Sequence, residues 1–405
     1  MFFRIMFFRS RRVDCINSSF TRIIIGSLFI VGCLFLLTVC NYSPNSREKL
    51  PRSEGSQRFF GNFTYQHHST ESKNEIQTIE IEKTKSSVNI SKSANIAINI
   101  RKWQEEYFPD NHAVRRVSTI LSIFRKKVAL NDRHLINPHD FKYIHNVANA
   151  CIGRTIELVV GIPTRADSFE ARQAIRETWG QYGSVPINNA VVLFFLGSKE
   201  EQNLQEKINS EALKYKDIVQ ENFIDSYRNL SLKTVALMKW VSIYCADSTF
   251  VLKADDDMYI NIPRLVMKLR EQRKRGPVFI LGAVHYNTEP FRDQKNKWFV
   301  TFDEYPSNMF PNYMSGTAYA MTSTAAIRLF VESLYVRNLF LEDVYLTGIV
   351  ADKAAVPRVK EADFTWGKYD PEGCNFKDKI SGHKNTPEEI RKIHRELFDP
   401  NLRCH

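Results

Sequence analysis

The chain has 405 residues, of which 43% are hydrophobic and 25% are charged, an ordinary composition for a globular protein that can build one large core. Its formal net charge of +11 raises the question of a nucleic-acid partner. The lysines and arginines are scattered and do not cluster with aromatic residues, so the composition argues against nucleic-acid binding.

An apolar run without a charge covers residues 23–40 and is just long enough to span a bilayer. Five arginines and a single aspartate precede it, so the positive-inside rule predicts a cytoplasmic tail at residues 1–22 and places the rest of the chain across the membrane. A cleaved signal peptide is the alternative, but the run exceeds the usual signal-peptide core and no small-residue cleavage site follows it. We expect the signal anchor of a single-pass type II membrane protein.

Residues 41–99 are rich in Ser, Asn, Lys and Glu and show little periodic apolar character. Such a composition cannot bury enough surface to order itself. Apolar residues at helical spacing appear between positions 117 and 124. We therefore expect a luminal stem over residues 41–137, with a helical part.

Four of the seven cysteines lie beyond the apolar run, and in an oxidising lumen they can form two disulfides in three alternative pairings. None of them has the spacing of a zinc site. They are Cys151, Cys245, Cys374 and Cys404. N-glycosylation triplets, one of them at Asn229, agree with a secretory-pathway lumen.

From residue 151 onward, short apolar runs alternate with helical patterns. We expect strands at 156–163, 190–197, 217–220, 249–254 and 278–284, and helices at 169–179, 200–215, 230–245 and 263–275. This alternation predicts an α/β fold with an open, largely parallel sheet covered by helices. Ligands of such sheets bind beyond the carboxyl ends of the strands.

Three consecutive carboxylates, Asp255, Asp256 and Asp257, directly follow the expected strand 249–254. Adjacent carboxylates repel one another, and a hard divalent cation such as Mg²⁺ or Mn²⁺ would stabilise them. A solvated acidic turn is the alternative interpretation. Their place at a strand end favours a ligand site.

Arg172 and Arg176 lie four residues apart, on one face of the expected helix 169–179. Two guanidinium groups near a strand end suit a diphosphate. Ion pairing with neighbouring acids is the alternative.

Glu342 and Asp343 stand in mostly apolar surroundings, where desolvation raises a carboxyl pKa and suits a general base. They can also open a helix and interact with its dipole. The segment 297–322 is rich in aromatic residues, which suit sugar rings as well as core packing. His383, by its surroundings alone, fits an exposed loop histidine better than a metal ligand.

Six ordered blocks resemble the β1,3-galactosyltransferase family, which also contains β1,3-N-acetylglucosaminyltransferases. The resemblance covers roughly residues 138–405, the expected catalytic domain. The blocks are RQAIRETWG, FFLG, ENFIDSYRNLSLKT, KADDDMYIN, the EYP…MSGTAYAMT block and EDVYLTG.

The resemblance implies a GT-A type fold. It also implies that the acidic turn holds Mn²⁺ (or Mg²⁺) against the diphosphate of a UDP-sugar. Asp257 would be the principal ligand of this metal, and Asp255 would lie nearer the ribose and the metal. The resemblance implies that His383 completes the metal coordination, which reverses the preference for a loop residue, and that Asp343 is the catalytic base. Asp256 is counted with the donor-binding residues, without a defined contact.

The resemblance also assigns four residues to the donor pocket: Thr164, Arg165, Arg172 and Arg176. Met314 stands where many relatives have a cysteine, so the resemblance supplies no disulfide partner for Cys245 and leaves its pairing open.

The implied activity is an inverting transfer of galactose from UDP-galactose to a hydroxyl of a glycan acceptor on a glycoprotein or glycolipid, in β1,3 linkage. The implied location is the Golgi membrane, with the catalytic domain in the lumen. A transferase that uses UDP-N-acetylglucosamine remains an alternative, as does a catalytically dead glycan-binding membrane protein.

Overall fold

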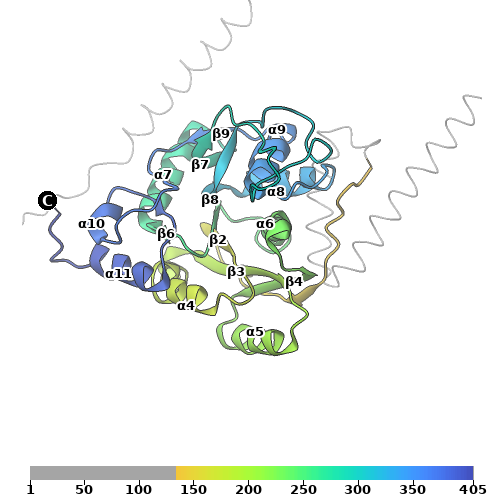
Figure 1. Ribbon diagram of the computed structural model, residues 1–405. Coiled ribbons are helices and arrows are strands. Elements are labelled where there is room, and N and C mark those ends of the chain that lie inside the picture. The colour runs from red at the N-terminus through yellow and green to blue at the C-terminus, as the bar shows by residue number, and fades with distance from the viewer. Residues whose placement is uncertain (1–133, 405) are drawn as a thin grey trace, which may run out of the picture. The chain divides into compact units, whose positions relative to one another are not determined.

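The structure is a computed structural model that describes residues 134–404. Its centre is an eight-stranded sheet with the strand order β1-β4-β3-β2-β5-β8-β7-β9 (Figure 1). The strands are β1 Tyr143–His145, β2 Leu158–Pro163, β3 Ala190–Ser198, β4 Ile218–Ile224, β5 Phe250–Ala254, β7 Ile280–His285, β8 Tyr313–Thr322 and β9 Arg358–Lys360.

Most neighbours in this sheet run parallel. The strands β4, β3, β2 and β5 form a continuous parallel block, and β9 is parallel to β7. β8 is antiparallel to both β5 and β7, and β1 is antiparallel to β4. A separate two-stranded antiparallel sheet pairs β6 (Tyr259–Ile260) with β10 (Ser381–Gly382).

Helices cover both faces of the sheet. Successive residues of β2 point to opposite faces: Val159 packs into the core under α6 and α8, and Leu158 and Val160 pack into the core shared with α4, α7 and α11. Figure 1 shows these two groups of helices on either side of the strands. The helices are α4 Phe169–Glu177, α5 Gln202–Tyr215, α6 Leu230–Tyr244, α7 Ile262–Arg275, α8 Ser323–Ser333, α9 Ala351–Lys353, α10 Gly373–Phe376, α11 Pro387–Leu397 and a π-helix at Val344–Val350.

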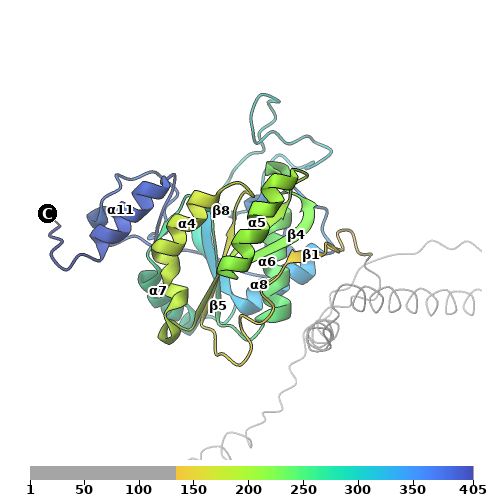
Figure 2. The same cartoon turned by 90° about the horizontal axis from the view of Figure 1, so that it is seen from below.

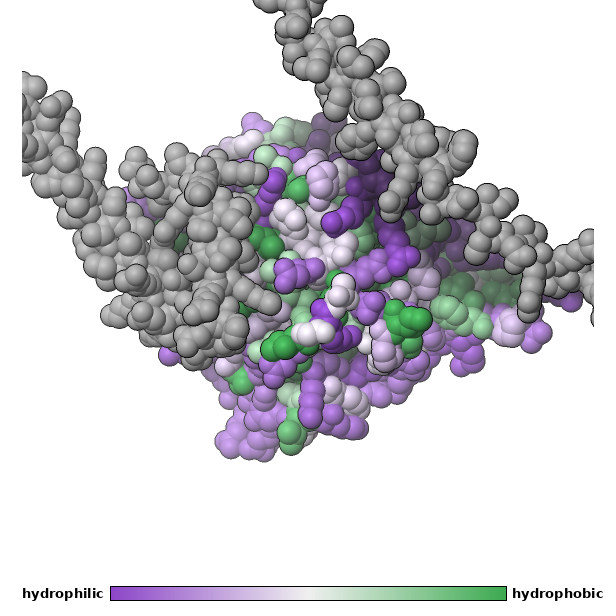
Figure 3. Space-filling model, turned by 180° about the vertical axis from the view of Figure 1, so that it is seen from behind, coloured by the Kyte–Doolittle hydropathy of each residue, from purple (hydrophilic) through white to green (hydrophobic). Residues whose placement is uncertain are grey.

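This arrangement confirms the predicted α/β class with an open, mostly parallel sheet between helices. The sheet is buried on both faces, and in one space-filling view the hydrophobic side chains of the described residues lie in small groups among hydrophilic ones (Figure 3). The sequence did not predict β8, which lies in the middle of the sheet and is the partner of β5.

Two disulfides join the four cysteines of the described residues. Cys151 pairs with Cys245, with 5.6 Å between their Cα atoms, and Cys374 pairs with Cys404, with 5.4 Å. The first bond gives Cys245 the partner that the resemblance had not supplied, because the chain brings Cys151 to it from before β2. Both distances lie in the ordinary range for disulfides.

The predicted cytoplasmic tail, the signal anchor and all but the last residues of the stem lie outside the described residues. No helix within residues 134–404 has both the length and the apolar composition needed to cross a membrane.

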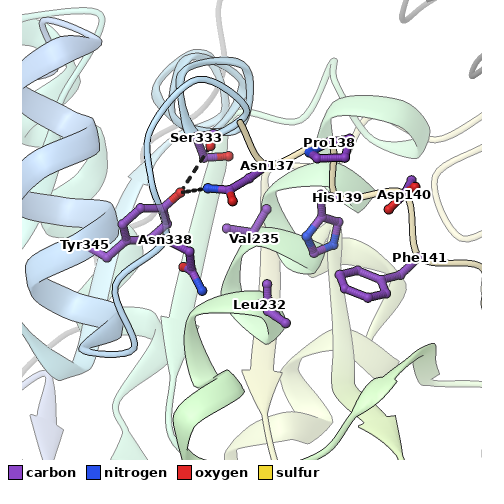
Figure 4. A pocket seen from close by; sticks show the side chains of 10 residues that line it. All are labelled: Asn137, Pro138, His139, Asp140, Phe141, Leu232, Val235, Ser333, Asn338 and Tyr345. Carbon is purple, nitrogen blue, oxygen red and sulfur yellow. Dashed lines mark hydrogen bonds between the residues drawn. The ribbon is translucent and has the colours of Figure 1, made fainter. Parts of the chain in front are cut away.

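A small cavity of about 130 Å³ lies under the segment 137–141, against α6 and the end of α8. In Figure 4, Asn137 donates to the hydroxyl of Tyr345, which in turn donates to the carbonyl of Ser333. None of the residues predicted for the functional site lines this cavity.

Candidate active site

The acidic turn begins where the buried strand β5 ends. The backbone N–H of Asp255 still donates to the carbonyl of Thr317 in β8 at 2.9 Å, so the first carboxylate is fixed by the sheet. The chain then turns through Asp256 and Asp257 into β6, whose partner β10 ends directly before His383. The backbone N–H of Asn385 also donates to the carbonyl of Asp257 at 2.9 Å. The small sheet thereby brings a C-terminal histidine to the end of β5.

Asp255, Asp257 and His383 form a cluster in which one ligand atom of each lies within 4.8 Å of the others. His383 Nε2 lies 3.2 Å from Asp257 Oδ2, and Nδ1 lies 3.2 Å from the carbonyl oxygen of Trp366. A proton on Nδ1 that is donated to this carbonyl leaves Nε2 free to bind a metal. All three side chains are partly exposed, so the cluster is open to solvent.

Two carboxylates and an imidazole are a donor set that Mn²⁺ or Mg²⁺ accepts, so the residues fit a divalent cation. Burial lowers the pKa of His383, but its bond to Asp257 and the charges of Asp257 and Asp255 raise it overall. Burial raises the pKa of Asp255 to about 6, although Lys253 opposes the shift. The raised pKa of His383 reflects the negative charge of the two carboxylates, and the same charge would attract a cation.

Asp256 points to a different partner. Its Oδ2 accepts a hydrogen bond from Thr164 Oγ1 at 2.6 Å, directly after β2. The ammonium group of Lys233 donates to the carbonyl of Thr164 at 2.6 Å and pairs with Asp225 at 2.9 Å. These contacts join the ends of β2 and β5 to the start of α6. The side chain of Arg165 is 74% exposed and pairs with Asp167.

Arg172 and Arg176 lie in an ion-pair network. Arg172 is fully buried, donates to Glu211 of α5 at 2.6 to 3.1 Å and also donates to two backbone carbonyls. Arg176 donates to Glu211 and to Asp217 at 2.7 to 2.9 Å. These are ion pairs of the kind that the sequence left open as the alternative. They hold α4 against α5, and a contact of either arginine with a diphosphate stays a prediction.

Asp343 lies at the start of the π-helix Val344–Val350, an element found mostly at functional sites. Its Oδ1 accepts from the N–H of Val344 at 2.9 Å, and its Oδ2 accepts from the N–H of Gly316 in β8 at 3.2 Å. The carboxylate both caps the helix and remains partly exposed. Burial raises the pKa of Asp343, which increases its basicity. Glu342, next to it, is turned into the core.

Lys253 connects the cluster of Asp255, Asp257 and His383 to Asp343. Its side chain is fully buried, and its ammonium group lies 2.6 Å from Asp255 Oδ1 and 3.5 Å from Glu342 Oε2. It also donates to the carbonyl oxygen of Gly316, the residue whose N–H binds Asp343. One residue of β8, Gly316, therefore binds the candidate base through its N–H and, by way of Lys253, contacts the candidate metal ligand Asp255 through its carbonyl.

A family model described as Galactosyltransferase matches residues 170–362. Beta-1,3-galactosyltransferase 1 of Homo sapiens is 35% identical over 271 residues, which cover 66% of this chain and 82% of that protein. The chain belongs to the β1,3-galactosyltransferase family. Beta-1,3-galactosyltransferase 2 of Homo sapiens is 34% identical over 267 residues, covering 64% of this chain and 63% of that protein. This β1,3-galactosyltransferase family member is therefore a hexosyltransferase.

Similar solved structures share little sequence with it. The galactosyltransferase LgtC in complex with donor and acceptor sugar analogs is 12% identical, with a TM-score of 0.32 over 60% of this chain and 98% of that one. Mouse xyloside xylosyltransferase 1 is 13% identical, with a TM-score of 0.29 over 53% of this chain and 87% of that one.

The structure of this family member adds two residues that the sequence did not assign. Lys253 is a charged residue inside an apolar strand, directly before the acidic turn, and that position was a signal that could have been used. Gly316 gave no such signal, because its importance comes from the close approach of Asp343. A Cβ atom at this position would lie 3.1 Å from Asp343 Oδ2.

Proposed function

We propose that this hexosyltransferase transfers galactose from UDP-galactose to a hydroxyl of a glycan acceptor, in β1,3 linkage and with inversion at the anomeric carbon. The observation that supports it most is that the cluster of Asp255, Asp257 and His383 is connected to Asp343. Lys253 contacts both Asp255 and the carbonyl of Gly316, and the N–H of Gly316 binds Asp343. A cation site for a diphosphate and a base for an incoming hydroxyl are the two parts that this reaction needs.

Asp255, Asp257 and His383 would hold the cation, for which we propose Mn²⁺. When bound, a divalent cation acts as a Lewis acid that neutralises the charge developing on the leaving diphosphate. The hydrogen bond between Asp256 and Thr164 keeps the acidic turn in register with β2, so that the ligand oxygens of its neighbours stay at the strand ends. A direct contact of Thr164, Arg165 or Asp256 with the nucleotide is part of the proposal.

Asp343 acts as the general base. Its carboxylate takes the proton from the acceptor hydroxyl while that oxygen forms a bond to the anomeric carbon and the bond from this carbon to the UDP oxygen breaks. Attack opposite the leaving group turns an α-linked donor into a β-linked product, and no covalent enzyme intermediate is needed. The N–H groups of Gly316 and Val344 hold the carboxylate in one orientation.

We place the reaction in the Golgi lumen, with the chain anchored by residues 23–40 and the acceptor on a glycoprotein or glycolipid. The charge distribution around the apolar run supports the membrane orientation in this proposal. The second candidate keeps the same chemistry and uses UDP-N-acetylglucosamine, since the residues described above bind the diphosphate side of the donor and not its sugar.

The test is a donor panel. The purified full-length chain is incubated with UDP-galactose, UDP-N-acetylglucosamine, UDP-N-acetylgalactosamine or UDP-glucose, with a set of simple glycosides as acceptors, in Mn²⁺ or in chelator. We expect transfer from UDP-galactose that chelator abolishes and Mn²⁺ restores. Transfer from another donor alone would overturn the donor assignment. Transfer that persists in chelator would overturn the metal assignment, and no transfer from any donor would overturn the function.

A further inference from the structure

The segment between β7 and β8, residues 286–312, is unusual in its length and its surface. It contains no helix or strand, and irregular loops of this length are usually either functional or disordered. Figure 2 shows it as a teal projection beyond the body of the domain. Five of its large apolar side chains are between 39% and 58% exposed: Tyr286, Phe291, Trp298, Phe302 and Met309.

This segment is held in one conformation in spite of its irregular backbone. The guanidinium group of Arg292 donates to the carbonyl oxygens of Val300, Tyr305 and Ser307, each at 2.8 Å, and stacks on Phe302 at 4.0 Å. Val300 is fully buried and anchors the segment to the core. The exposed aromatic rings are therefore presented on a preorganised support, which lowers the entropy cost of binding a ligand.

The segment contacts the elements that carry the site. Trp298 Nε1 donates to the hydroxyl of Tyr227 at 3.1 Å, and Glu304 pairs with Arg228 at 2.7 Å. Arg228 in turn stacks on Phe340 at 4.1 Å, three residues before the base. The exposed segment, the turn Tyr227–Asn229 and the loop before the π-helix are thus joined by direct contacts.

Tyr227 is the residue of this group whose phenol responds to the charges of Asp343 and Asp255. Its ring is 56% exposed. Partial burial raises the pKa of its phenol, the bond from Trp298 lowers it, and the negative charges of Asp343 and Asp255 raise it further. The phenol therefore lies within the electrostatic range of both Asp343, the proposed base, and Asp255, a proposed metal ligand. The mechanism above uses neither Tyr227 nor Trp298.

We propose that Tyr227 and Trp298 form the acceptor subsite and bind the apolar face of a pyranose ring, the sugar whose hydroxyl is presented to Asp343. This inference rests on the proposed function and names the surface on which its acceptor binds. Aromatic rings with a polar edge suit a sugar, because the ring contacts C–H groups and the edge exchanges hydrogen bonds with hydroxyls. Charged side chains stand around the pair, with Lys297 at 4.5 Å from the Trp298 ring, so the surface is not a continuous apolar interface.

The test measures initial rates of the full-length chain with methyl β-glycosides of N-acetylglucosamine and of galactose, using whichever one the parent protein glycosylates better. Trp298→Ala is expected to raise the KM for this acceptor about tenfold, the effect of losing one stacked ring. The KM for the UDP-sugar and the binding of UDP with Mn²⁺, measured by calorimetry, are expected to stay unchanged. Trp298→Phe keeps a ring and is expected to restore most of the acceptor affinity.

The control is Phe398→Ala, which removes an exposed ring (56%, against 39% for Trp298) that lies at the end of α11. It is expected to leave both KM values as in the parent. An unchanged acceptor KM in Trp298→Ala, in a protein that still transfers sugar, would overturn the subsite and leave the proposed function standing. If the parent protein is a dimer in light scattering and Trp298→Ala is a monomer, the surface serves self-association, and this result would also overturn the inference.

Discussion

Lys253→Met tests how much the buried ion pairs of Lys253 contribute to the free energy of unfolding. The lysine is fully buried, and its nearest carboxylates are Asp255 at 2.6 Å and Glu342 at 3.5 Å, the latter also buried. Removing one partner of a buried ion pair costs about 3–5 kcal/mol, because the other charge is left without compensation. Since the side chain of Asp255 is 29% exposed and can be solvated, we expect the lower end, about 3 kcal/mol. This corresponds to a fall in Tm of roughly 6–12 °C.

The assay is thermal and urea unfolding of the parent, Lys253→Met, Glu342→Gln and the double variant. Glutamine keeps an acceptor for the Tyr319 hydroxyl and removes the charge, so the double variant is expected to be more stable than Lys253→Met. The control is Lys268→Met, because Lys268 also contacts two carboxylates, at 3.1 and 3.3 Å, but is partly exposed. Its loss should cost less than about 1 kcal/mol. Equal losses at Lys253 and Lys268, or no coupling between Lys253 and Glu342, would refute this reasoning.

Three further variants test the base, its support and a buried histidine. Asp343→Asn keeps the shape of the side chain and one of its two acceptor oxygens, but removes the charge and the basic group. It should lower kcat about 10²- to 10⁴-fold with UDP binding retained; an unchanged rate would remove Asp343 as base. Gly316→Ala places a Cβ atom 3.1 Å from Asp343 Oδ2, so we expect kcat to fall by about tenfold while UDP and Mn²⁺ still bind in calorimetry; unchanged kcat would contradict it. Burial lowers the pKa of His139 below 6.5, so protonation favours the unfolded chain and stability is lost as pH falls below that value. His139→Gln should flatten this loss in urea titrations between pH 7.5 and 5.5, and parallel pH slopes for variant and parent would show that His139 does not cause it.

The main elements of the fold were predictable because both faces of the sheet are buried. A strand such as β3 reads as a continuous apolar run, and a helix such as α7 carries clear 3.6-residue periodicity. The sequence gives no strand pattern for β8, because Gly316 and the prolines before it interrupt the pattern, and the aromatic residues of this stretch suit sugar rings as well as core packing. Its strand character comes from pairing with β5 and β7 on both sides, which no local pattern expresses.

The sequence could single out residues by their own chemistry, as for Asp255 and Asp257, which the structure brings together with His383 and whose role stays a prediction. The site was not predictable where the role depends on a partner far along the chain. Arg172 looks like a phosphate ligand by sequence, and its partner Glu211 is visible only once α5 lies against α4. The pairing of Cys245 was undetermined for the same reason, since the three alternatives are equal until the chain is folded.

The two-stranded sheet pairs β6 with β10, a strand that is synthesised more than a hundred residues later, so the candidate site is completed late during synthesis. Asp255, Asp257 and Asp343 are synthesised before His383, and the segment that holds His383 in place continues into α11, whose Ile390 and Ile393 are fully buried. A growing chain can build most of the parallel sheet before its third candidate ligand exists. On the proposed function, the cation site is therefore complete only late in synthesis, and a chain truncated before β10 is expected to keep Asp255, Asp257 and Asp343 but to lack transferase activity.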